Sequence, residues 1–554
     1  MTPEKECGYK NFFMKFIKPH ACTMVILIIL NFVGMLFSLI NPLLTRSLID
    51  DVFIDKKTEI FGYILFGVFG IYIVSAIAKY ISDYIKGKLE LILFKNISGA
   101  VFDVVQFASL EKTQEFKVGD LLSRIMNNVH SVISIFTLII PYFLMSITSI
   151  VAPLLIMLKL NVQLTLVFMM PIIFFLLSSL FFGKQLRHKQ RTSLDKTALV
   201  YSFLTDSLSK IYIIKVFGLE AWAKNKFNDN INEYYDSSID VIKTSSLNSS
   251  FGSLINGLPI FLLFSFGGTM VIRGSLTLGT FMAFMSYVAL FFAPISQLSH
   301  LWTFFKSSSA SFDRVNEILM LNQDDTSDGA LIVRDGNIEF YDVWFSYDNK
   351  PILEGFNAIF KKGLNYIVGD NGTGKTTILK LISSLYPLKR GYITIDGQNI
   401  SKVAINDLRK NISMVFSDSY LFDASIYENI LLGDLSASEG DVINAAKQVH
   451  AHEFIKRLPK GYETDVGENG LKLSSGEKQK IALARSILKD TPIMLLDEVT
   501  KSIDAESRQS INETIKKLKT RKTLIIVTHN MEEIDYGSNV IYLEPPNHYS
   551  ADVN

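Results

Sequence analysis

The sequence predicts two domains of different fold class, an all-α domain of membrane-spanning helices followed by an α/β domain. Three observations lead to this prediction. Residues 1–310 contain six apolar runs of roughly 20 residues, the length that crosses a bilayer. Residues 330–554 instead have the mixed composition of a soluble α/β domain. In this second half, the strand-like run Leu364–Val368 leads through a glycine-rich loop into a helical pattern at Thr377–Leu385.

The overall composition excludes several classes of protein. The chain has 554 residues and a formal net charge of +1, which gives no indication of a nucleic-acid partner. Its two cysteines, Cys7 and Cys22, lie near the start and support neither a disulfide framework nor a metal site. Six long apolar runs rarely occur together in soluble proteins, so buried helices of a large soluble core are the weaker interpretation.

The predicted domains follow the apolar runs. Residues 1–20 form an N-terminal segment, 21–320 a transmembrane domain, 321–335 a linker and 336–554 the α/β domain. The predicted spans lie near 21–45, 60–84, 132–158, 162–183, 244–272 and 279–305.

Charge in the loops predicts the orientation of the spans. The loop Ile49–Glu59 is acid-rich, whereas segments 85–131 and 184–243 carry many basic residues. The positive-inside rule therefore places both termini and both long segments in the cytoplasm. These segments are longer than a hairpin needs, so we expect helices that continue beyond the bilayer and turn back through a short crosswise helix.

The spans carry few charges. Lys, Arg, Asp and Glu are absent from the middle of five spans, and the second span carries Lys79 and Asp83 near its inner end. Because an intramembrane charge usually marks the path of a charged substrate, this pattern argues against a polyanionic one. The candidate residues for lining a substrate cavity are polar or aromatic: Asn248, Asn256, Tyr287, Gln297 and His300.

The glycine-rich loop, Gly369–Thr376, fits the pattern G-x-x-x-x-G-K-[ST]. In such a loop, backbone N–H groups and the lysine hold nucleotide phosphates, and the hydroxyl residue binds Mg²⁺. We assign the lysine and metal roles to Lys375 and Thr376. The predicted nucleotide-binding residues of this segment are Gly369, Asn371, Gly372, Thr373, Gly374, Lys375, Thr376 and Thr377.

A second segment, Leu495–Glu498, is an apolar strand that ends in two carboxylates. Asp497 is suited to the Mg²⁺ shell and Glu498 to polarising the attacking water. Together, these segments predict an ATPase that uses Mg²⁺.

Three motifs, Gly369–Thr376, Leu473–Glu477 and Leu495–Glu498, together with the preceding spans, resemble an ATP-binding cassette (ABC) exporter over nearly the whole chain. The resemblance implies a P-loop ABC nucleotide-binding domain in which Tyr347 stacks on adenine and His529 contacts the γ-phosphate. It assigns Asp504 to the D-loop. It also implies short coupling helices at about 108–117 and 211–220.

The family signature in this chain comprises Ser474, Ser475, Gly476 and Glu477. In ABC dimers this segment closes over the ATP held by the opposite subunit, so the resemblance implies a dimer. Three positions in two motifs depart from the family pattern: in the signature, Ser475 and Glu477 replace glycine and glutamine, and in the Q-loop, Ser417 replaces the usual glutamine. An altered signature is also found in one half of heterodimeric exporters. We expect a homodimer, with a heterodimer of two half-transporters as the alternative.

The resemblance implies ATP-driven export across a bacterial cytoplasmic membrane. We expect the cargo to be a small peptide natural product or an amphipathic compound. A lipid or lipid-linked glycan flippase is one alternative, and an ATP-gated sensor with weak transport is another, favoured only by Ser417 and Ser475.

Overall fold

The computed structural model describes residues 10–321, 329–348, 350–500 and 505–544, apart from some side chains within helices. The chain divides into two compact units. The membrane unit comprises Met1–Val101 and Leu122–Glu317. The nucleotide unit comprises Phe102–Leu121 and Ile318–Asn554, so a short piece of the first half belongs to the second unit.

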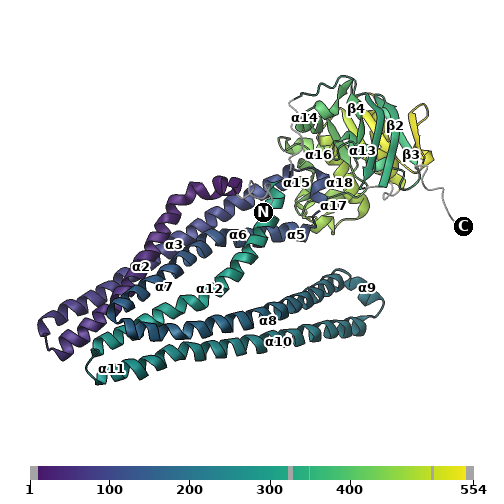
Figure 1. Cartoon of the computed structure of the whole chain (residues 1–554). Coiled ribbons are helices and arrows are strands. Elements are labelled where there is room, and N and C mark those ends of the chain that lie inside the picture. The colour runs from purple at the N-terminus through teal and green to yellow at the C-terminus, as the bar shows by residue number, and fades with distance from the viewer. Residues whose placement is uncertain (1–9, 322–328, 349, 501–504, 545–554) are drawn as a thin grey trace. The chain divides into compact units, whose positions relative to one another are not determined.

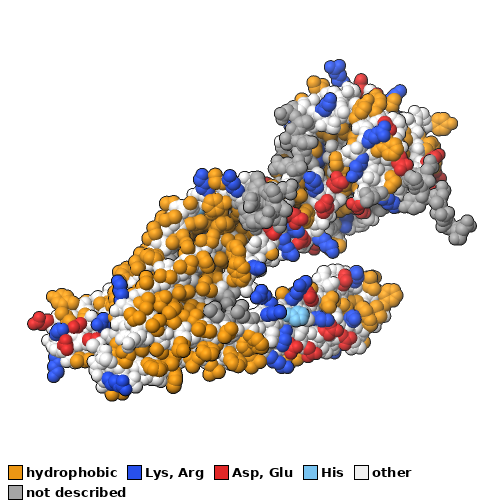
Figure 2. Space-filling view, in the orientation of Figure 1, with side chains coloured by type: hydrophobic (Ala, Val, Ile, Leu, Met, Phe, Trp, Pro, Cys, Tyr) orange, Lys and Arg blue, Asp and Glu red, His pale blue; other side chains and the backbone are white. Residues whose placement is uncertain are grey.

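The membrane unit is helical, as predicted. Its long helices are α2 (Ala21–Ser47), α3 (Phe61–Phe107), α7 (Ile140–Leu160), α8 (Val162–Ser209), α10 (Glu220–Leu262) and α12 (Leu278–Leu319). Shorter ones are α6 (Val129–Ser134), α9 (Ile211–Val216) and α11 (Gly268–Ile272), whereas α5 (Val118–Ser123) runs across the boundary at which the chain passes from the nucleotide unit to the membrane unit. Within the described part of the chain, five helical segments are long and apolar enough to cross a membrane, and Val162–Phe174 is a shorter apolar helix. Hydrophobic side chains cover a broad band of these helices (Figure 2).

Several helices are much longer than a bilayer is thick. Helix α3 has 47 residues and α8 has 48, so each extends for about 70 Å at 1.5 Å per residue, against about 30 Å of hydrocarbon. Helices α8 and α10 lie side by side and antiparallel, with α9 at their turn (Figure 1). Beyond the apolar part, Lys196 and Glu233 pair across them at 2.6 Å. The predicted extension of helices outside the membrane is confirmed.

Two contacts hold distant helices of the membrane unit together. The hydroxyl of Tyr287, which is fully buried, donates to the carbonyl oxygen of Leu39 at 2.6 Å. The carboxylate of Asp50 accepts from the N–H of Gly279 at 2.7 Å and from the hydroxyl of Thr277 at 2.5 Å. A Cβ at Gly279 would lie 2.5 Å from the Arg46 carbonyl oxygen, so this approach requires glycine.

The nucleotide unit contains two sheets. An antiparallel sheet has the order β2-β1-β4-β5, formed by β1 (Ile338–Tyr347), β2 (Lys350–Phe360), β4 (Arg390–Ile395) and β5 (Gln398–Asn399). A parallel sheet has the order β6-β7-β8-β3-β9, formed by β3 (Gly363–Gly369), β6 (Ile412–Val415), β7 (Ile493–Asp497), β8 (Thr523–Val527) and β9 (Asn539–Leu543). Its helices are α4 (Leu110–Gln114), α13 (Lys375–Ile382), α14 (Ile405–Lys410), α15 (Ile426–Leu431), α16 (Glu439–Gln448), α17 (His452–Arg457), α18 (Ser475–Leu488) and α19 (Ala505–Leu518).

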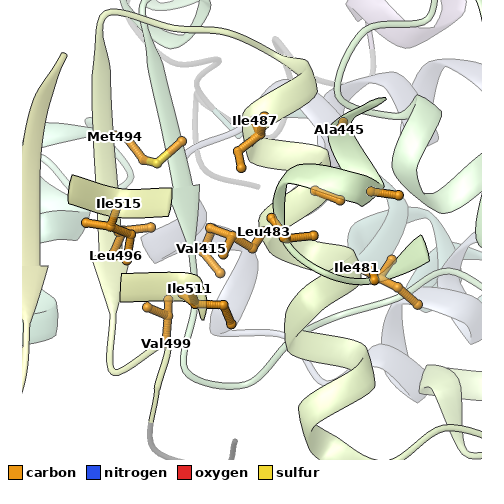
Figure 3. Packing of buried hydrophobic residues seen from close by; sticks show 14 of the residues in the cluster. Val415, Ala445, Ile481, Leu483, Ile487, Met494, Leu496, Val499, Ile511 and Ile515 are labelled. Carbon is orange, nitrogen blue, oxygen red and sulfur yellow. The ribbon is translucent and has the colours of Figure 1, made fainter. Parts of the chain in front are cut away.

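The parallel sheet is buried on both faces. Met494 and Leu496 of β7 belong to one apolar cluster, whereas Ile493 and Leu495 belong to another. This follows from the alternation of side chains along a strand, and it explains why β7 is apolar throughout. The first cluster packs against α18 through residues such as Leu483 (Figure 3). Because the sheet is packed between two apolar clusters, its strands, and the residues that follow their ends, are held in fixed positions.

Helix α4 and residues 329–337 are attached to the nucleotide unit. Leu110 packs against its second apolar cluster, and Tyr386 donates its hydroxyl hydrogen to Gln114 at 2.6 Å. Helix α4 lies within the predicted first coupling helix, 108–117. The carboxylate of Asp396 accepts from four backbone N–H groups, those of residues 334–337, at 2.7–3.1 Å. The end of the predicted linker is therefore hydrogen-bonded to the unit, and residues 322–328 of that linker lie outside the described residues.

Candidate functional site

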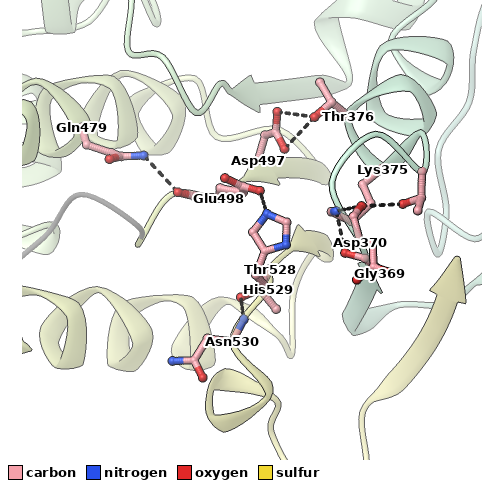
Figure 4. A network of polar contacts seen from close by, with 11 residues as sticks. Gly369, Asp370, Lys375, Thr376, Gln479, Asp497, Glu498, Thr528, His529 and Asn530 are labelled. Atoms are coloured by element: carbon pink, nitrogen blue, oxygen red, sulfur yellow. Dashed lines mark hydrogen bonds and ion pairs between the residues drawn. The ribbon is translucent and has the colours of Figure 1, made fainter. Parts of the chain in front are cut away.

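The motifs of the nucleotide unit meet at the carboxyl ends of three neighbouring parallel strands. The phosphate loop follows β3, the pair Asp497 and Glu498 ends β7, and His529 follows β8, which lies between the other two strands. In open parallel sheets, ligands bind outside the carboxyl ends of the strands. The sheet order therefore brings together segments that are more than a hundred residues apart in sequence, as Figure 4 shows.

The phosphate loop is stabilised by its own lysine. The Lys375 ammonium group, on a buried side chain, donates to the carbonyl oxygens of Gly369 and Asp370, both at 2.7 Å. Gly374 has a φ of 96° just before α13, and a Cβ there would lie 2.7 Å from Ile352. Asn371 and Gly372 form the exposed tip of the loop. A cation over a loop that leads into a helix N-terminus is an arrangement suited to anionic phosphates.

Thr376 and Asp497 face each other. The threonine hydroxyl donates to the two carboxylate oxygens at 3.1 and 2.9 Å. Burial raises the pKa of Asp497, and the hydrogen bond from Thr376 acts in the opposite direction. A hydroxyl and a carboxylate are hard oxygen donors of the kind that Mg²⁺ prefers, so these residues fit the ion.

Glu498 contacts His529 through its carboxylate and the Nε2 atom of the imidazole (Figure 4). The backbone of Glu498 has a φ of 48°, in the left-handed region, which costs a non-glycine residue about 1–3 kcal/mol. Two hydrogen bonds hold it there. Its N–H donates to Val527 at 3.1 Å, and Gln479 donates to its carbonyl oxygen at 3.4 Å. The strained backbone therefore directs the carboxylate toward His529, where it can act on a water molecule.

Gln479 is a functional candidate that sequence reasoning missed. Its side chain is only 2% exposed, and it links α18, the helix after the signature, to the backbone of Glu498. The available signal was a polar side chain two positions after Glu477 on an amphipathic helix. A buried amide on such a helix needs a hydrogen-bond partner, and here the partner is the backbone carbonyl oxygen of Glu498.

Tyr347 lies at the end of β1, beside the phosphate loop. Its hydroxyl is 3.5 Å from that of Thr377, and its ring meets Tyr386 edge to face with centroids 5.2 Å apart. Because Tyr386 also bonds Gln114, one contiguous set of residues runs from α4 to the predicted adenine-stacking tyrosine.

The signature segment begins α18 with a capping box. The Ser474 hydroxyl accepts from the N–H of Glu477 at 3.3 Å, and the Glu477 carboxylate accepts from the Ser474 N–H and hydroxyl, both at 2.8 Å. The glutamate that replaces glutamine therefore has a structural use, because it caps the helix. Ser475 is exposed in the first turn, with Gly476 next to it.

Ser417 follows β6 and is exposed. Its sequence neighbours Phe416 and Asp418, but not Ser417 itself, line a cavity of about 280 Å³ together with residues that include Tyr420 and Arg485. Burial lowers the pKa of Arg485, which donates to the carbonyl oxygens of Asn429 and Tyr420.

The remaining predicted residues are placed as follows. Tyr287 is fully buried and bonded to Leu39, and Asn248 is half-buried on α10. Asp504 lies outside the described residues, as do the side chains of Asn256, Gln297 and His300.

Comparisons with known proteins show the family of the chain. The family model described as the ABC transporter transmembrane region matches residues 24–295, and the model described as ABC transporter matches 355–501. The chain is 30% identical over 551 residues to YgaD of Bacillus subtilis, named a multidrug export ATP-binding/permease protein, with 97% of this chain and 95% of that protein covered.

Two further relatives extend the comparison. An ATP-dependent lipid A-core flippase of Syntrophus aciditrophicus is 27% identical over 537 residues, covering 96% of this chain and 89% of that protein. The solved structure of a bacterial Atm1-family ABC exporter with ATP bound has the same fold, with a TM-score of 0.81 at 23% identity over 95% of this chain and 94% of that one. The chain therefore belongs to the ABC transporter family, as a multi-pass membrane exporter whose ATPase domain follows its transmembrane domain in one polypeptide.

Proposed function

We propose that two copies of this chain form an exporter of small peptide natural products or other amphipathic compounds in a bacterial cytoplasmic membrane, with both termini in the cytoplasm. The observation that carries the mechanism is the convergence of Lys375, the Thr376–Asp497 pair and the Glu498–His529 pair at one sheet edge. Such an edge has the cation, metal donors and water-polarising carboxylate that phosphoryl transfer requires.

Each residue has a distinct role in this proposal. Lys375 exchanges its two carbonyl partners for the β- and γ-phosphates, and Tyr347 stacks on adenine. Thr376 and Asp497 hold Mg²⁺, which neutralises charge on the phosphates when it is bound. Glu498 accepts a proton from the attacking water, and His529 orients that carboxylate while contacting the γ-phosphate.

The proposed dimer is supported by an exposed apolar surface at the tip of the α8–α10 hairpin. Ile211, Tyr212, Val216 and Phe217 are about half exposed or more, although they lie outside the apolar band that faces lipid. Exposed apolar clusters on a polar surface usually mark an interface. We infer that this tip docks beside Ser417 on the nucleotide unit of the second copy, and that Ser474 of each copy meets the ATP held by the other.

A flippase for lipids or lipid-linked glycans is the second candidate. It is favoured by relatives named ATP-dependent lipid A-core flippases, at 27% and 29% identity. Export and lipid flipping use the same ATPase, so they are distinguished by the cargo. Reconstituted vesicles that contain a fluorescent phospholipid report flipping through the loss of dithionite-accessible signal, whereas uptake of an amphipathic dye by inside-out vesicles reports export.

ATP hydrolysis by the chain purified alone in lipid nanodiscs is the first test. We expect Glu498→Gln to lower the rate by about 10²–10⁴-fold while ATP still binds, because the amide cannot accept the proton. Glu439→Gln, on the exposed first turn of α16, is the matched control and should hydrolyse ATP at the wild-type rate.

An unchanged rate in Glu498→Gln would contradict the assigned role of this residue. If the wild-type chain binds ATP and forms no active dimer by itself, the homodimer is wrong, and a second half-transporter must supply the other signature.

A further inference from the structure

A cavity of about 780 Å³ lies among α2, α3, α7 and α12 of the membrane unit. We name it the four-helix pocket. Its size is within the range of roughly 300–1,000 Å³ that holds drug-sized ligands. The polar residues that matter most for its chemistry are Ser38, Asn41, Thr45, Tyr72, Ser149 and Ser286.

The pocket is polar without being charged. Among the described residues that line it, none is Asp, Glu, Lys, Arg or His, while hydroxyl and amide groups come from every helix that borders it. An ion in such a place would be desolvated without an opposite charge to compensate, which is costly at membrane depth. A neutral molecule would pay no such penalty, so the lining selects for uncharged ligands.

The hydrogen bonds inside the lining indicate which groups a ligand should carry. Ser38 donates to the carbonyl oxygen of Met35 at 2.6 Å, Thr45 to that of Asn41 at 3.0 Å, and Ser286 to that of Met282 at 3.3 Å. These hydroxyl hydrogens are used, so the oxygen atoms remain as acceptors. The Asn41 side-chain amide donates to the Tyr72 hydroxyl at 3.3 Å, which leaves the side-chain carbonyl oxygen of Asn41 as a further acceptor and the Tyr72 hydroxyl hydrogen as a donor.

The pocket also follows a pattern in the sequence. Gly34, Ser38, Asn41 and Thr45 recur at helical spacing along α2, and Tyr142, Ser146 and Ser149 recur along α7. Stripes of small and hydroxyl residues in membrane helices usually let two helices pack closely. Here the stripes border an open volume instead, so their small size leaves room for a ligand.

We propose that the four-helix pocket binds the exported compound and that it accepts an uncharged amphipathic molecule carrying N–H or O–H donors. This inference rests on the proposed export function and adds the substrate class. It excludes anionic and cationic amphiphiles as preferred cargo.

Two fluorescent probes that share an anilinonaphthalene skeleton test the proposal. N-phenyl-1-naphthylamine is neutral and carries one N–H, whereas 8-anilino-1-naphthalenesulfonate adds a sulfonate. Each is titrated onto the full-length chain in phosphatidylcholine nanodiscs, with empty nanodiscs as the baseline. We expect saturable binding of the neutral probe, and binding of the sulfonate that is weaker by about tenfold or more.

Ser149→Leu fills the pocket from α7, and we expect it to weaken binding of the neutral probe by about tenfold. The control is Thr148→Leu on the same helix, whose hydroxyl bonds Leu144 at 2.9 Å and which does not line the pocket. Ser286→Leu repeats the test from α12. Thermal unfolding of each preparation shows whether the variant is folded.

Equal binding of the two probes would overturn the proposal, as would wild-type affinity in both folded pocket variants. The rate of ATP hydrolysis in the same nanodiscs separates the two claims. Hydrolysis without binding of the neutral probe would overturn the pocket alone. Pocket-sensitive binding without hydrolysis would support the pocket and overturn the proposed export function.

Discussion

The nucleotide unit and the membrane unit use polar side chains in opposite ways. In the nucleotide unit, charged groups such as Lys375 and Asp497 are buried at one sheet edge and held by hydrogen bonds of 2.7–3.1 Å. In the membrane unit, uncharged groups such as Ser38 and Asn41 are spread along helices around an open pocket. The nucleotide unit is surrounded by water and the membrane unit largely by lipid, and this difference determines which polar groups each unit can bury.

The two environments should also respond differently to the same core mutation, and this is the largest expected effect. Leu495 is fully buried in β7, and Leu263 is fully buried among the membrane helices. We expect Leu495→Ala to cost about 3–5 kcal/mol, because it loses both the transfer of apolar surface from water and the packing. Leu263→Ala should cost about 1–2 kcal/mol, because lipid solvates the exposed side chain as well as protein does.

Hydrogen exchange of backbone amides around each position measures the free energy of local opening in the intact protein. Equal losses of opening free energy in Leu495→Ala and Leu263→Ala would contradict the comparison. Burial of Leu263 among the membrane helices would then stabilise the fold as much as burial of Leu495 in a core that excludes water.

Two aspartates that accept backbone N–H groups, one in each unit, extend the comparison. Their replacement should have an effect of intermediate size. Asp396 and Asp50 both accept backbone N–H groups, four in the first case. We expect Asp396→Asn to cost about 1–2 kcal/mol, because charge-assisted bonds become neutral ones, whereas Asn retains the left-handed φ of 48°. Asp50→Asn should cost less than Asp396→Asn, since Asp50 accepts from one backbone N–H group, that of Gly279, where Asp396 accepts from four.

Acid should reveal the contribution of Asp396. Burial acts to raise the pKa of this carboxyl, but the four backbone N–H groups outweigh it, so the net shift is downward. A carboxyl with a lowered pKa stabilises the fold at pH values above its pKa in the unfolded chain, about 3.9. This contribution is lost as the pH falls through the pKa of the folded state. Exchange of amides 334–337 should rise in that range for the wild type and change less in Asp396→Asn. The same rise in both proteins would contradict this origin.

Two buried hydroxyl groups complete the comparison, and the one in the membrane unit gives the smallest expected effect. Tyr287→Phe removes the bond to Leu39 among the membrane helices and should cost about 0.6 kcal/mol, the average for such bonds in lipid. Thr491→Val leaves the Ser413 hydroxyl without the bond at 2.9 Å and should cost about 1–2 kcal/mol. Thermal unfolding of the whole chain in nanodiscs measures both. A larger loss at Tyr287 than at Thr491 would reverse the expected order.

Much of the nucleotide site could be predicted from sequence because its motifs are local. The predicted phosphate loop, Asp497, Glu498 and His529 do meet, since consecutive carboxyl ends of a parallel sheet share one edge. The capping role of Glu477 and the bond from Gln479 to Glu498 were not predicted, because both depend on how α18 is placed. The family resemblance implied a coupling helix at about 108–117, and the structure adds the residues of α4 that contact the nucleotide unit, Leu110 and Gln114.

In the membrane half, the sequence determined the helical class, the apolar length of the spans and their lack of charge. It placed Tyr287 among the cavity candidates, and the structure buries this residue against Leu39. Only the tertiary structure decided which polar stripes face a common space, because a helix can present any side to its neighbours and lipid imposes no rotation on it. Motif order along the chain is enough to assemble a parallel sheet edge, whereas a pocket between helices exists only once their rotations are set.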